Sequence, residues 1–442
     1  MAAGHSLDLA RWQAHFDGLM GRIAGRFGRV EPRRHARDLV AGLMSDLPGK
    51  NCWTIAEHAG HPAPGRLQHL LARAVWDADG VRDDLRGYVT EHLGDAGAVL
   101  VVDETGDLKK GTRTVAVQRQ YTGTAGRIEN AQVAVYLTYA TAAGHALIDR
   151  ALYLPGSWAG DPGRRAAAGV PADAQFATKP ALARQMIIRA LDGGAAAGWV
   201  AGDEVYGADP GLRAELEARG TRYVLGVACS HHVTTAAGRQ RADTIAARLP
   251  RRAWQRISAG QGSKGPRCYD WAWIEIDADA APAGQRSLLI RRNNITSELA
   301  FFRCYAAAPV PLTALVRVAG RRWTVEESFQ AGKGLAGLDH HQVRRWNSWH
   351  HWTTLAILAS AFLAVLAATE RARQPPPDGM IPLTSSEIHH LLNVLPRPAG
   401  PQHRTPPALV HLAATAPVPR QDQSLPTAST NMKITIYSCR TR

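Results

Sequence analysis

Two short apolar runs that each lead into an aspartate restrict the possible folds of this chain more than any other feature. Residues 98–102 read Ala-Val-Leu-Val-Val before Asp103, and residues 199–202 read Trp-Val-Ala-Gly before Asp203. A continuous apolar run of this kind is typical of a strand that is buried on both faces. The sequence therefore predicts an α/β architecture in which two strands each end in an acid, and the carboxyl ends of strands are where sites commonly form in such sheets. Taken singly, each aspartate also fits a helix cap or a turn.

Strand and helix patterns alternate around these two runs. We predict strands at residues 114–118, 131–139, 146–154 and 223–228, and helices at residues 180–191 and 210–219. Residues 230–306 return to strand-like alternation, and helical periodicity resumes from residue 312. The apolar run 355–368 is about fourteen residues long, which favours a buried core helix over a membrane span.

The first part of the chain is predicted to be helical, because apolar residues recur at intervals of three or four from residue 7 to residue 93. Within it, residues 54–60 and 64–74 read as two short helices joined by a glycine-containing turn. The second of these helices carries Arg66 and Arg73. This spacing fits a DNA-binding helix-turn-helix, and it also fits a plain helical bundle.

The charge balance favours a polyanionic partner. The chain has 52 Lys and Arg residues against 38 Asp and Glu residues, which gives a net charge of +14. A GC-rich coding sequence, which favours Arg codons over Lys codons, is an alternative explanation for this excess of basic residues. Charge alone therefore does not establish DNA binding. The five cysteines lack the short paired spacing of a zinc site or a disulfide framework, and they fit a reducing cytoplasm.

A third acid lies on a predicted amphipathic helix around residues 321–329. Arg322, Glu326 and Lys333 follow one another at offsets of four and seven, which places all three on one helix face. A surface stripe of ion pairs fits this pattern as well as a catalytic face does. The adjacent Glu327 is the alternative acid, and we prefer Glu326 because it aligns with the two cations.

Basic residues also follow the first acid. Lys109 and Lys110 lie just beyond the predicted strand that leads into Asp103, where they fit either a DNA contact or a solvated turn. An ionised carboxylate at Asp103 would be costly to bury unless a positive charge lies near it, and a bound cation would supply that charge.

Four stretches of the chain carry a family resemblance, which runs from about residue 50 to about residue 369. They are Val-Asp-Glu-Thr-Gly at 102–106, Gln-Tyr-Thr-Gly-Thr-Ala-Gly at 120–126, Gly-Asp-Glu-Val-Tyr-Gly at 202–207 and Arg-Trp-Thr-Val-Glu-Glu-Ser-Phe at 322–329. In this order they resemble the DDE insertion-sequence transposases, which have an RNase H-like catalytic fold. The resemblance implies a β-strand insertion between the second and third acids.

The resemblance also implies a catalytic site. Asp103, Asp203 and Glu326 would hold two Mg²⁺ or Mn²⁺ ions, and Arg322 and Lys333 match the cations of the family signature around the glutamate. In-line attack on a phosphodiester uses one metal to activate the nucleophile and another to stabilise the leaving oxygen. The signature also has a tyrosine three positions before the arginine, and Ala319 stands there in this chain.

The expected fold class is thus α/β, with an RNase H-like catalytic core, a β-rich insertion and an N-terminal all-helical domain. We divide the chain into five parts: a helical domain that binds the terminal repeats (1–95), the first part of the core (96–229), the insertion (230–306), the second part of the core (307–370) and a Pro/Ala-rich, partly disordered tail (371–442).

The resulting prediction is a DNA transposase that cuts and rejoins strands at the ends of an insertion sequence. Its expected partners are the terminal inverted repeats, target DNA and a second copy of itself in a synaptic complex. We expect it in the bacterial cytoplasm, associated with the nucleoid and without a membrane. Two alternatives remain open: an RNase H-like nuclease without strand transfer, and a non-catalytic DNA-binding protein derived from a transposase.

The end of the chain departs from this pattern. Residues 384–387, Thr-Ser-Ser-Glu, predict a capping box for a short helix through residue 392. Beyond residue 396 no periodicity is visible, and our hypothesis is that the reading frame shifted near residue 400.

Overall fold

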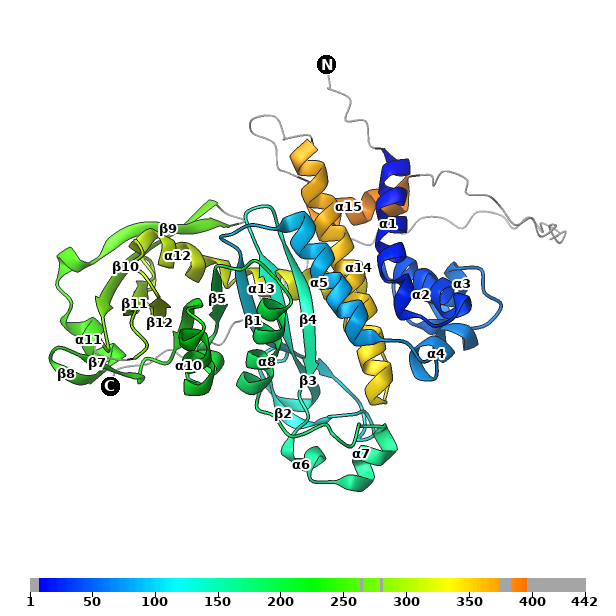
Figure 1. Cartoon of the computed structure of the whole chain (residues 1–442), viewed down its shortest axis with the longest axis horizontal. Helices are drawn as coiled ribbons and strands as arrows, with labels where there is room; N and C mark the ends of the chain where they lie inside the picture. Colours follow the sequence, from blue (N-terminus) through cyan, green and yellow to red (C-terminus); the bar gives the residue numbers. More distant parts are fainter. Residues whose placement is uncertain (1–7, 263–264, 279–280, 374–382, 396–442) are drawn as a thin grey trace, which may run out of the picture.

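The structure is a computed structural model that describes residues 8–262, 265–278, 281–373 and 383–395. A mixed sheet runs through its centre, with the strand order β2-β3-β1-β5-β6-β12-β11-β10-β9 and with β4 also paired to β3. Figure 1 shows the N-terminal helices at one end of the molecule and the strands β9 to β12 at the other.

The core of the sheet has RNase H-like connectivity. Its strands are β1 (Val99–Leu108), β2 (Gln118–Thr122), β3 (Arg127–Ala140), β4 (His145–Leu152), β5 (Trp199–Gly202) and β6 (Arg222–Val227). Strand β3 is antiparallel to both β1 and β4, whereas β5 is parallel to β1 and β6 is parallel to β5. The order β4-β3-β1-β5-β6 with only β3 reversed is the RNase H-like arrangement, so the predicted α/β class is confirmed.

The segment between the second and third acids continues this same sheet. It contains β7 (His232–Thr235), β8 (Gly238–Arg241), α11 (Ala242–Arg248), η2 (Arg251–Ala253), β9 (Gln255–Gly262), β10 (Gly265–Glu275), β11 (Gln285–Arg292) and β12 (Leu299–Ala306). Strand β12 pairs antiparallel with β6, which joins the insertion edge to edge with the core. A second, smaller apolar cluster that includes Val233, Ile245 and Phe301 stabilises this end.

One predicted strand is wrong in its position. Residues 114–117 are not a strand, and β2 begins only at Gln118. Ala116 has a φ of 62°, which an extended strand does not permit. The apolar residues 115–117 are buried nonetheless, and the Val115 amide donates to the Arg344 carbonyl oxygen.

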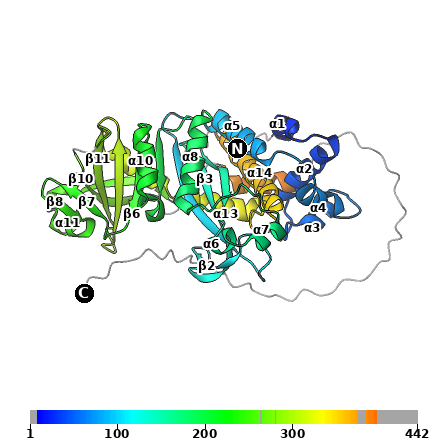
Figure 2. The same cartoon turned by 60° about the horizontal axis from the view of Figure 1, so that its bottom comes forward.

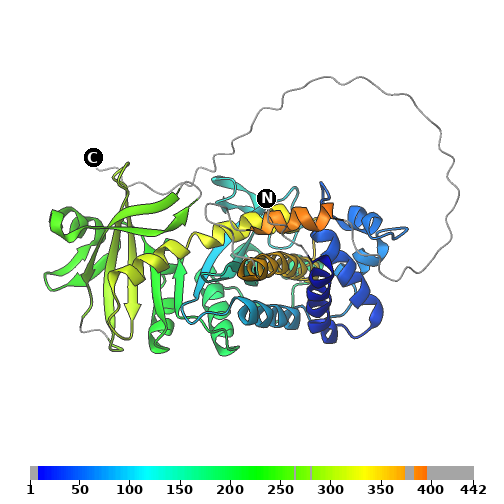
Figure 3. The ribbon, with the colours of Figure 1, turned by 90° about the horizontal axis from the view of Figure 1, so that it is seen from above.

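The N-terminal region is helical, as its periodicity predicts. It comprises α1 (Leu9–Arg22), η1 (Ala24–Arg26), α2 (Val30–Leu43), α3 (Cys52–His58), α4 (Gly65–Ala72) and α5 (Ala78–Leu93). Of these, α1, α2, α4 and α5 pack on the long helix α14 (Trp346–Arg373), which also contacts β4. In Figure 3 the gold α14 lies between the light-blue α5 and the yellow and orange helices.

Helix α14 is long and apolar enough to cross a membrane by composition, but 89% of its most apolar window is buried inside the structure. A helix that is apolar on all sides and enclosed by other elements is a core helix. The prediction of a buried core helix in this stretch is confirmed.

Helices cover both faces of the core sheet. They include α8 (Lys179–Asp192), α9 (Glu204–Gly207), α10 (Pro210–Ala218), α12 (Leu312–Arg321) and α13 (Thr324–Ala336), while the short α6 (Gly156–Ala159) and α7 (Pro162–Ala168) pack on each other. Figure 2 shows α8 and α13 on opposite sides of β3. Both helices contact β1, so side chains from either face can reach the first acid.

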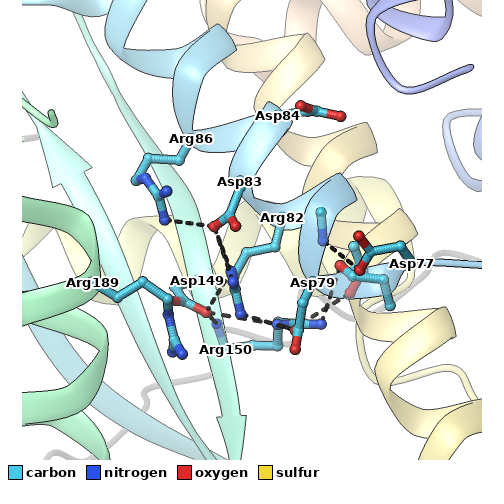
Figure 4. Close-up of polar contacts among 12 residues, drawn as sticks. Asp77, Asp79, Arg82, Asp83, Asp84, Arg86, Asp149, Arg150 and Arg189 are labelled. Atoms are coloured by element: carbon cyan, nitrogen blue, oxygen red, sulfur yellow. Dashed lines mark hydrogen bonds and ion pairs between the residues drawn. The ribbon is translucent and has the colours of Figure 1, made fainter. Parts of the chain in front are cut away.

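A buried network of charges fastens α5 to β4 (Figure 4). Asp149 is fully buried on β4, where its carboxylate accepts from Arg189 Nε at 3.1 Å and lies 3.7 Å from Arg82 Nε. Arg150, also buried, donates to Asp79 Oδ1 at 3.0 Å and to Thr354 Oγ1 at 2.9 Å. Buried charges are tolerated only when they are paired in this way, so the network fixes α5, β4 and α14 relative to one another.

The predicted capping box is present. Helix α15 (Ser385–Val394) begins after Thr384, whose hydroxyl accepts from the Glu387 amide at 3.3 Å while the Glu387 carboxylate accepts from the Thr384 amide at 2.7 Å. The hypothesis of a shifted reading frame near residue 400, and the predicted disorder beyond it, lie outside the described residues.

Candidate active site

The first acid, Asp103, lies in the interior of β1 rather than at its end, which corrects the sequence prediction. Strand β1 continues to Leu108 because β3 pairs with its whole length. The parallel pairing with β5, however, stops at the pair Val102 and Gly202. Asp103 is therefore the first residue beyond the parallel ladder, and its side chain is 11% exposed.

The second acid, Asp203, occupies the equivalent position after β5. It is the N-cap of α9, and its Oδ1 accepts from the Val205 amide at 2.9 Å. Because Val102 and Gly202 are paired neighbours, the aspartates that follow them lie at the same edge of the sheet. The structure thus brings the two predicted acids together.

Burial and the neighbouring negative charges raise the pKa values of both aspartates. Burial, followed by the charge of Asp203, raises the pKa of Asp103 well above its usual value. Burial, followed by the charge of Glu104, raises the pKa of Asp203 to about 6. The Arg322 guanidinium, whose Nη1 lies 3.7 Å from Asp103 Oδ2, opposes both shifts. A bound cation would relieve the same repulsion.

The third acid, Glu326, lies in the first turn of α13. Its charge contributes to the raised pKa of Asp103, after the larger contributions of burial, Asp203 and Glu104. The neighbouring Glu327 turns to His145 instead, with its Oε2 3.2 Å from the imidazole Nε2.

The helix predicted to carry Arg322, Glu326 and Lys333 on one face is in fact broken. Helix α12 ends at Arg321, residues 322–323 form a turn, and α13 begins at Thr324. The three side chains nevertheless all act on residues of β1. Lys333 donates from Nζ to Thr105 Oγ1 at 2.8 Å, two residues beyond Asp103, so both cations flank β1.

These residues suit a hard divalent cation in the chemistry of their donors. Carboxylate oxygens are the ligands that Mg²⁺ and Mn²⁺ prefer. Across the part of the chain that the structure describes, no three His, Cys, Asp or Glu side chains are gathered into a ready metal-binding group. Asp103 and Asp203 are the pair that the fold places together, and Glu326 approaches them from α13.

Glu104 is a member of this site that the sequence did not reveal. Its carboxylate accepts hydrogen bonds from Lys179 Nζ at 2.7 Å and from the Tyr206 hydroxyl. Its charge also raises the pKa of both aspartates, so it lies beside them. The only sequence signal was its position next to Asp103.

The other predicted DNA-binding residues differ in their exposure. Lys109 is buried and donates from Nζ to the His341 carbonyl oxygen at 3.0 Å, whereas Lys110 is exposed. Arg66 is exposed on α4, and Arg73 is exposed at its C-cap. The opposite face of α4 packs its leucines into the core.

Sequence comparison places the chain in a family. The profile of the DDE superfamily endonucleases matches residues 22–266, which is more than half of the chain. This protein therefore belongs to the DDE superfamily endonucleases. The matched segment contains Asp103 and Asp203 and ends before Glu326.

Individual relatives are similar over smaller parts or at lower identity. The chain is 37% identical over 97 residues to a probable transposase for insertion sequence element IS701 from Microchaete diplosiphon. This matched segment is 22% of this chain and 26% of that protein. The chain thus spans about a quarter of the length of that curated relative. It is also similar to the piggyBac transposase in a synaptic complex with hairpin DNA, at a TM-score of 0.41 and 11% identity, covering 88% of this chain and 80% of the other.

Proposed function

We propose that this protein is a DNA transposase that cleaves strands at the ends of an insertion sequence and joins them to target DNA. The observation that carries the proposal is the pair Asp103 and Asp203 at the end of the β1–β5 ladder, with Arg322 against Asp103 and Glu326 entering from α13. Membership of the DDE superfamily endonucleases and the similarity to a probable IS701 transposase support it.

In this proposal Asp103, Asp203 and Glu326 hold two Mg²⁺ or Mn²⁺ ions. Divalent ions supply an activated nucleophile and a stabilised leaving oxygen in phosphoryl transfer. The raised pKa values of the aspartates fit this role, because carboxylates that repel one another without a cation bind one favourably.

The cations around the acids act on the DNA backbone. Arg322 sits beside Asp103 and presents a planar guanidinium suited to the non-reacting oxygens of the scissile phosphate. Lys333 donates a hydrogen bond to Thr105, and its Nζ lies 3.9 Å from Asp107 Oδ1. Its positive charge therefore lies beside β1, beyond Asp103.

The remaining parts of the chain serve DNA binding and assembly. We propose that residues 1–95 bind the terminal inverted repeats, with Arg66 and Arg73 on the exposed side of α4, and that Lys109 and Lys110 flank the DNA near the acids. Residues 96–229 and 307–370 form the catalytic core around the insertion 230–306, and residues 371–442 form the tail. Two copies hold the two ends in one synaptic complex, in the bacterial cytoplasm at the nucleoid.

A strand-transfer assay tests this function. A labelled duplex carrying the element's own end is mixed with a target plasmid, Mn²⁺ or Mg²⁺ and the protein. We expect labelled plasmid to form with the wild-type protein and not with the Glu326→Gln variant. Cutting of the duplex without joining would replace the proposal with an RNase H-like nuclease, and binding without cutting would replace it with a non-catalytic DNA-binding protein.

A further inference from the structure

A cavity of about 920 Å³ lies between the N-terminal helices and the segment that follows α13. One wall consists of residues 48–53 and of Gln68 and its neighbours on α4, and the other consists of residues 339–345. None of the three acids lines this cavity, so it is not the catalytic centre itself.

The walls combine an aromatic side chain with free positive charge. Trp53, in the first turn of α3, is 68% exposed, which is unusual for so large an apolar side chain. Arg344 and Arg345 line the same cavity and are exposed. Within the described ranges, neither arginine side chain forms a hydrogen bond or an ion pair.

A second cavity of about 390 Å³ lies next to this one, at the end of β1. Gln342 and Arg344 line both cavities, and Lys109 and Lys110 line the second. Lys110 is exposed, and its ammonium group forms no hydrogen bond or ion pair within the described part of the chain. The two cavities therefore share Gln342 and Arg344 as lining residues, and we refer to them together as the basic path because Lys109, Lys110, Arg344 and Arg345 line it.

The path reaches the strand of the first acid through direct contacts. Lys109 directly follows β1, and its Nζ donates to the His341 carbonyl oxygen at 3.0 Å. The His341 Nε2 lies 3.2 Å from Asp107 Oδ2, and Asp107 in turn lies 3.9 Å from Lys333 Nζ. This chain of contacts leads from the cavities back along β1 to the residues around Asp103.

We propose that the two cavities form one binding site for a short unpaired segment of DNA. In this site Trp53 stacks on a base, while Arg344, Arg345 and Lys110 bind the phosphates. An exposed aromatic ring beside free cations is the combination that binds single-stranded nucleic acid, because every base offers a face for stacking. The larger cavity has the volume of a site for roughly two or three nucleotides, which is too small for a turn of duplex.

The proposal rests on the proposed function, since it concerns the DNA that the active site would process. It gives the unpaired strand a place between the N-terminal helices, residues 339–345 and the end of β1, apart from the three acids. Because stacking and phosphate binding need no divalent ion, the site can be tested without catalysis.

The test measures binding of fluorescein-labelled hexathymidylate and of a blunt-ended DNA hairpin duplex to the full-length protein in EDTA. We expect Trp53→Ala to weaken hexathymidylate binding about tenfold, with Trp53→Phe close to wild type because a phenyl ring still stacks. Duplex binding should change little in either variant. Trp53 is largely exposed, so the substitutions should leave the thermal unfolding temperature unchanged.

A charge-matched pair of variants tests the phosphate contacts. Arg344→Ala/Arg345→Ala should weaken hexathymidylate binding and flatten its salt dependence, because fewer counterions are released. Arg251→Ala/Arg252→Ala removes the same charge from η2, which lines neither cavity, and should weaken binding much less.

Three outcomes would overturn the site: no binding of hexathymidylate by the wild-type protein, equal binding by Trp53→Ala, or equal losses in the two arginine double variants. Loss of duplex binding in step with the single strand would assign the surface to duplex DNA instead. Metal-dependent cleavage is measured in parallel on the wild-type protein. Absent cleavage with Trp53-dependent binding would contradict the proposed function alone.

Discussion

Glu327 and His145 form an ion pair, with the carboxylate Oε2 3.2 Å from the imidazole Nε2. The hydrogen bond from His145 is the main reason that the pKa of Glu327 lies below its usual value. His145 Nδ1 is in turn 2.8 Å from Ser328 Oγ, which anchors the imidazole against α13. Glu327 is thus held at the start of β4, while the charge of Glu326 acts on Asp103.

This arrangement predicts opposite outcomes for two adjacent substitutions. Glu326→Gln should lower the rate of metal-dependent cleavage on the order of a thousandfold, because a metal ligand supplies several kcal/mol of transition-state stabilisation. Glu327→Gln should cleave at close to the wild-type rate. The measurement is single-turnover cleavage of a labelled duplex, and a larger loss in Glu327→Gln than in Glu326→Gln would reverse the assignment.

The raised pKa of Asp203 predicts that the site costs stability in the absence of metal. A carboxyl whose pKa is about 6 in the folded state holds its proton more tightly there than in the unfolded chain. Stability therefore falls as the pH rises from about 4 to about 6, and the full penalty is present above that range. Asp203→Asn removes the charge and keeps an oxygen to accept from the Val205 amide.

We expect Asp203→Asn to raise the free energy of unfolding by about 1–3 kcal/mol at pH 7.5 in EDTA, and by much less at pH 4.5. Urea denaturation at both pH values measures this difference. Adding Mg²⁺ at pH 7.5 should stabilise the wild-type protein more than the variant, because binding to the folded state alone adds stability. A variant that is less stable than wild type at pH 7.5 would show that the aspartate charge is not strained.

The position of Glu104 predicts an effect on metal affinity rather than on chemistry. Removing its charge with Glu104→Gln makes the electrostatic potential at Asp103 and Asp203 less negative. We expect the Mg²⁺ concentration for half-maximal cleavage to rise about tenfold, as for other residues that support metal ligands, while the rate at saturating metal is retained. Tyr206→Phe is the control, since it removes one hydrogen bond to Glu104 and keeps the charge. An equal rise in both variants would assign the effect to hydrogen bonding.

The buried network at Asp149 predicts a large loss of stability. Asp149→Ala leaves Arg82 and Arg150 buried near α5 without this carboxylate, which should lower the free energy of unfolding by about 3–5 kcal/mol. The exposed pair of Arg127 and Glu129 is the comparison, and Glu129→Ala should cost about 0–1 kcal/mol. Urea denaturation measures both, and similar losses would show that the network does not hold α5 to the sheet.

Local patterns predict the fold of this chain well where burial dominates. The apolar runs before Asp103 and Asp203 are buried parallel strands, and the run in α14 is a core helix, because continuous apolar segments must be enclosed. These predictions use only interactions between adjacent residues and the need to exclude water. The proximity of the two aspartates depends instead on the parallel pairing of β1 with β5, which joins segments far apart in the chain.

The features that the sequence did not reveal depend on contacts between distant residues. Glu104 joins the site through Lys179 and Tyr206, which lie 75 and 102 positions further along the chain. The break between α12 and α13 at residues 322–323 contains neither proline nor glycine, so no local signal marks it. Residues 115–117 have strand-like composition, yet the backbone of Ala116 excludes a strand.

The most direct test of the central claim is cleavage of a supercoiled plasmid that carries the element's two ends, comparing wild type with Asp203→Asn in Mg²⁺ or Mn²⁺. The account predicts metal-dependent cutting at the ends by the wild-type protein and none by the variant, although the variant binds the same DNA and is no less stable. Cutting by Asp203→Asn at the wild-type rate, or wild-type cutting that persists in EDTA, would contradict a carboxylate-held metal site at Asp103 and Asp203.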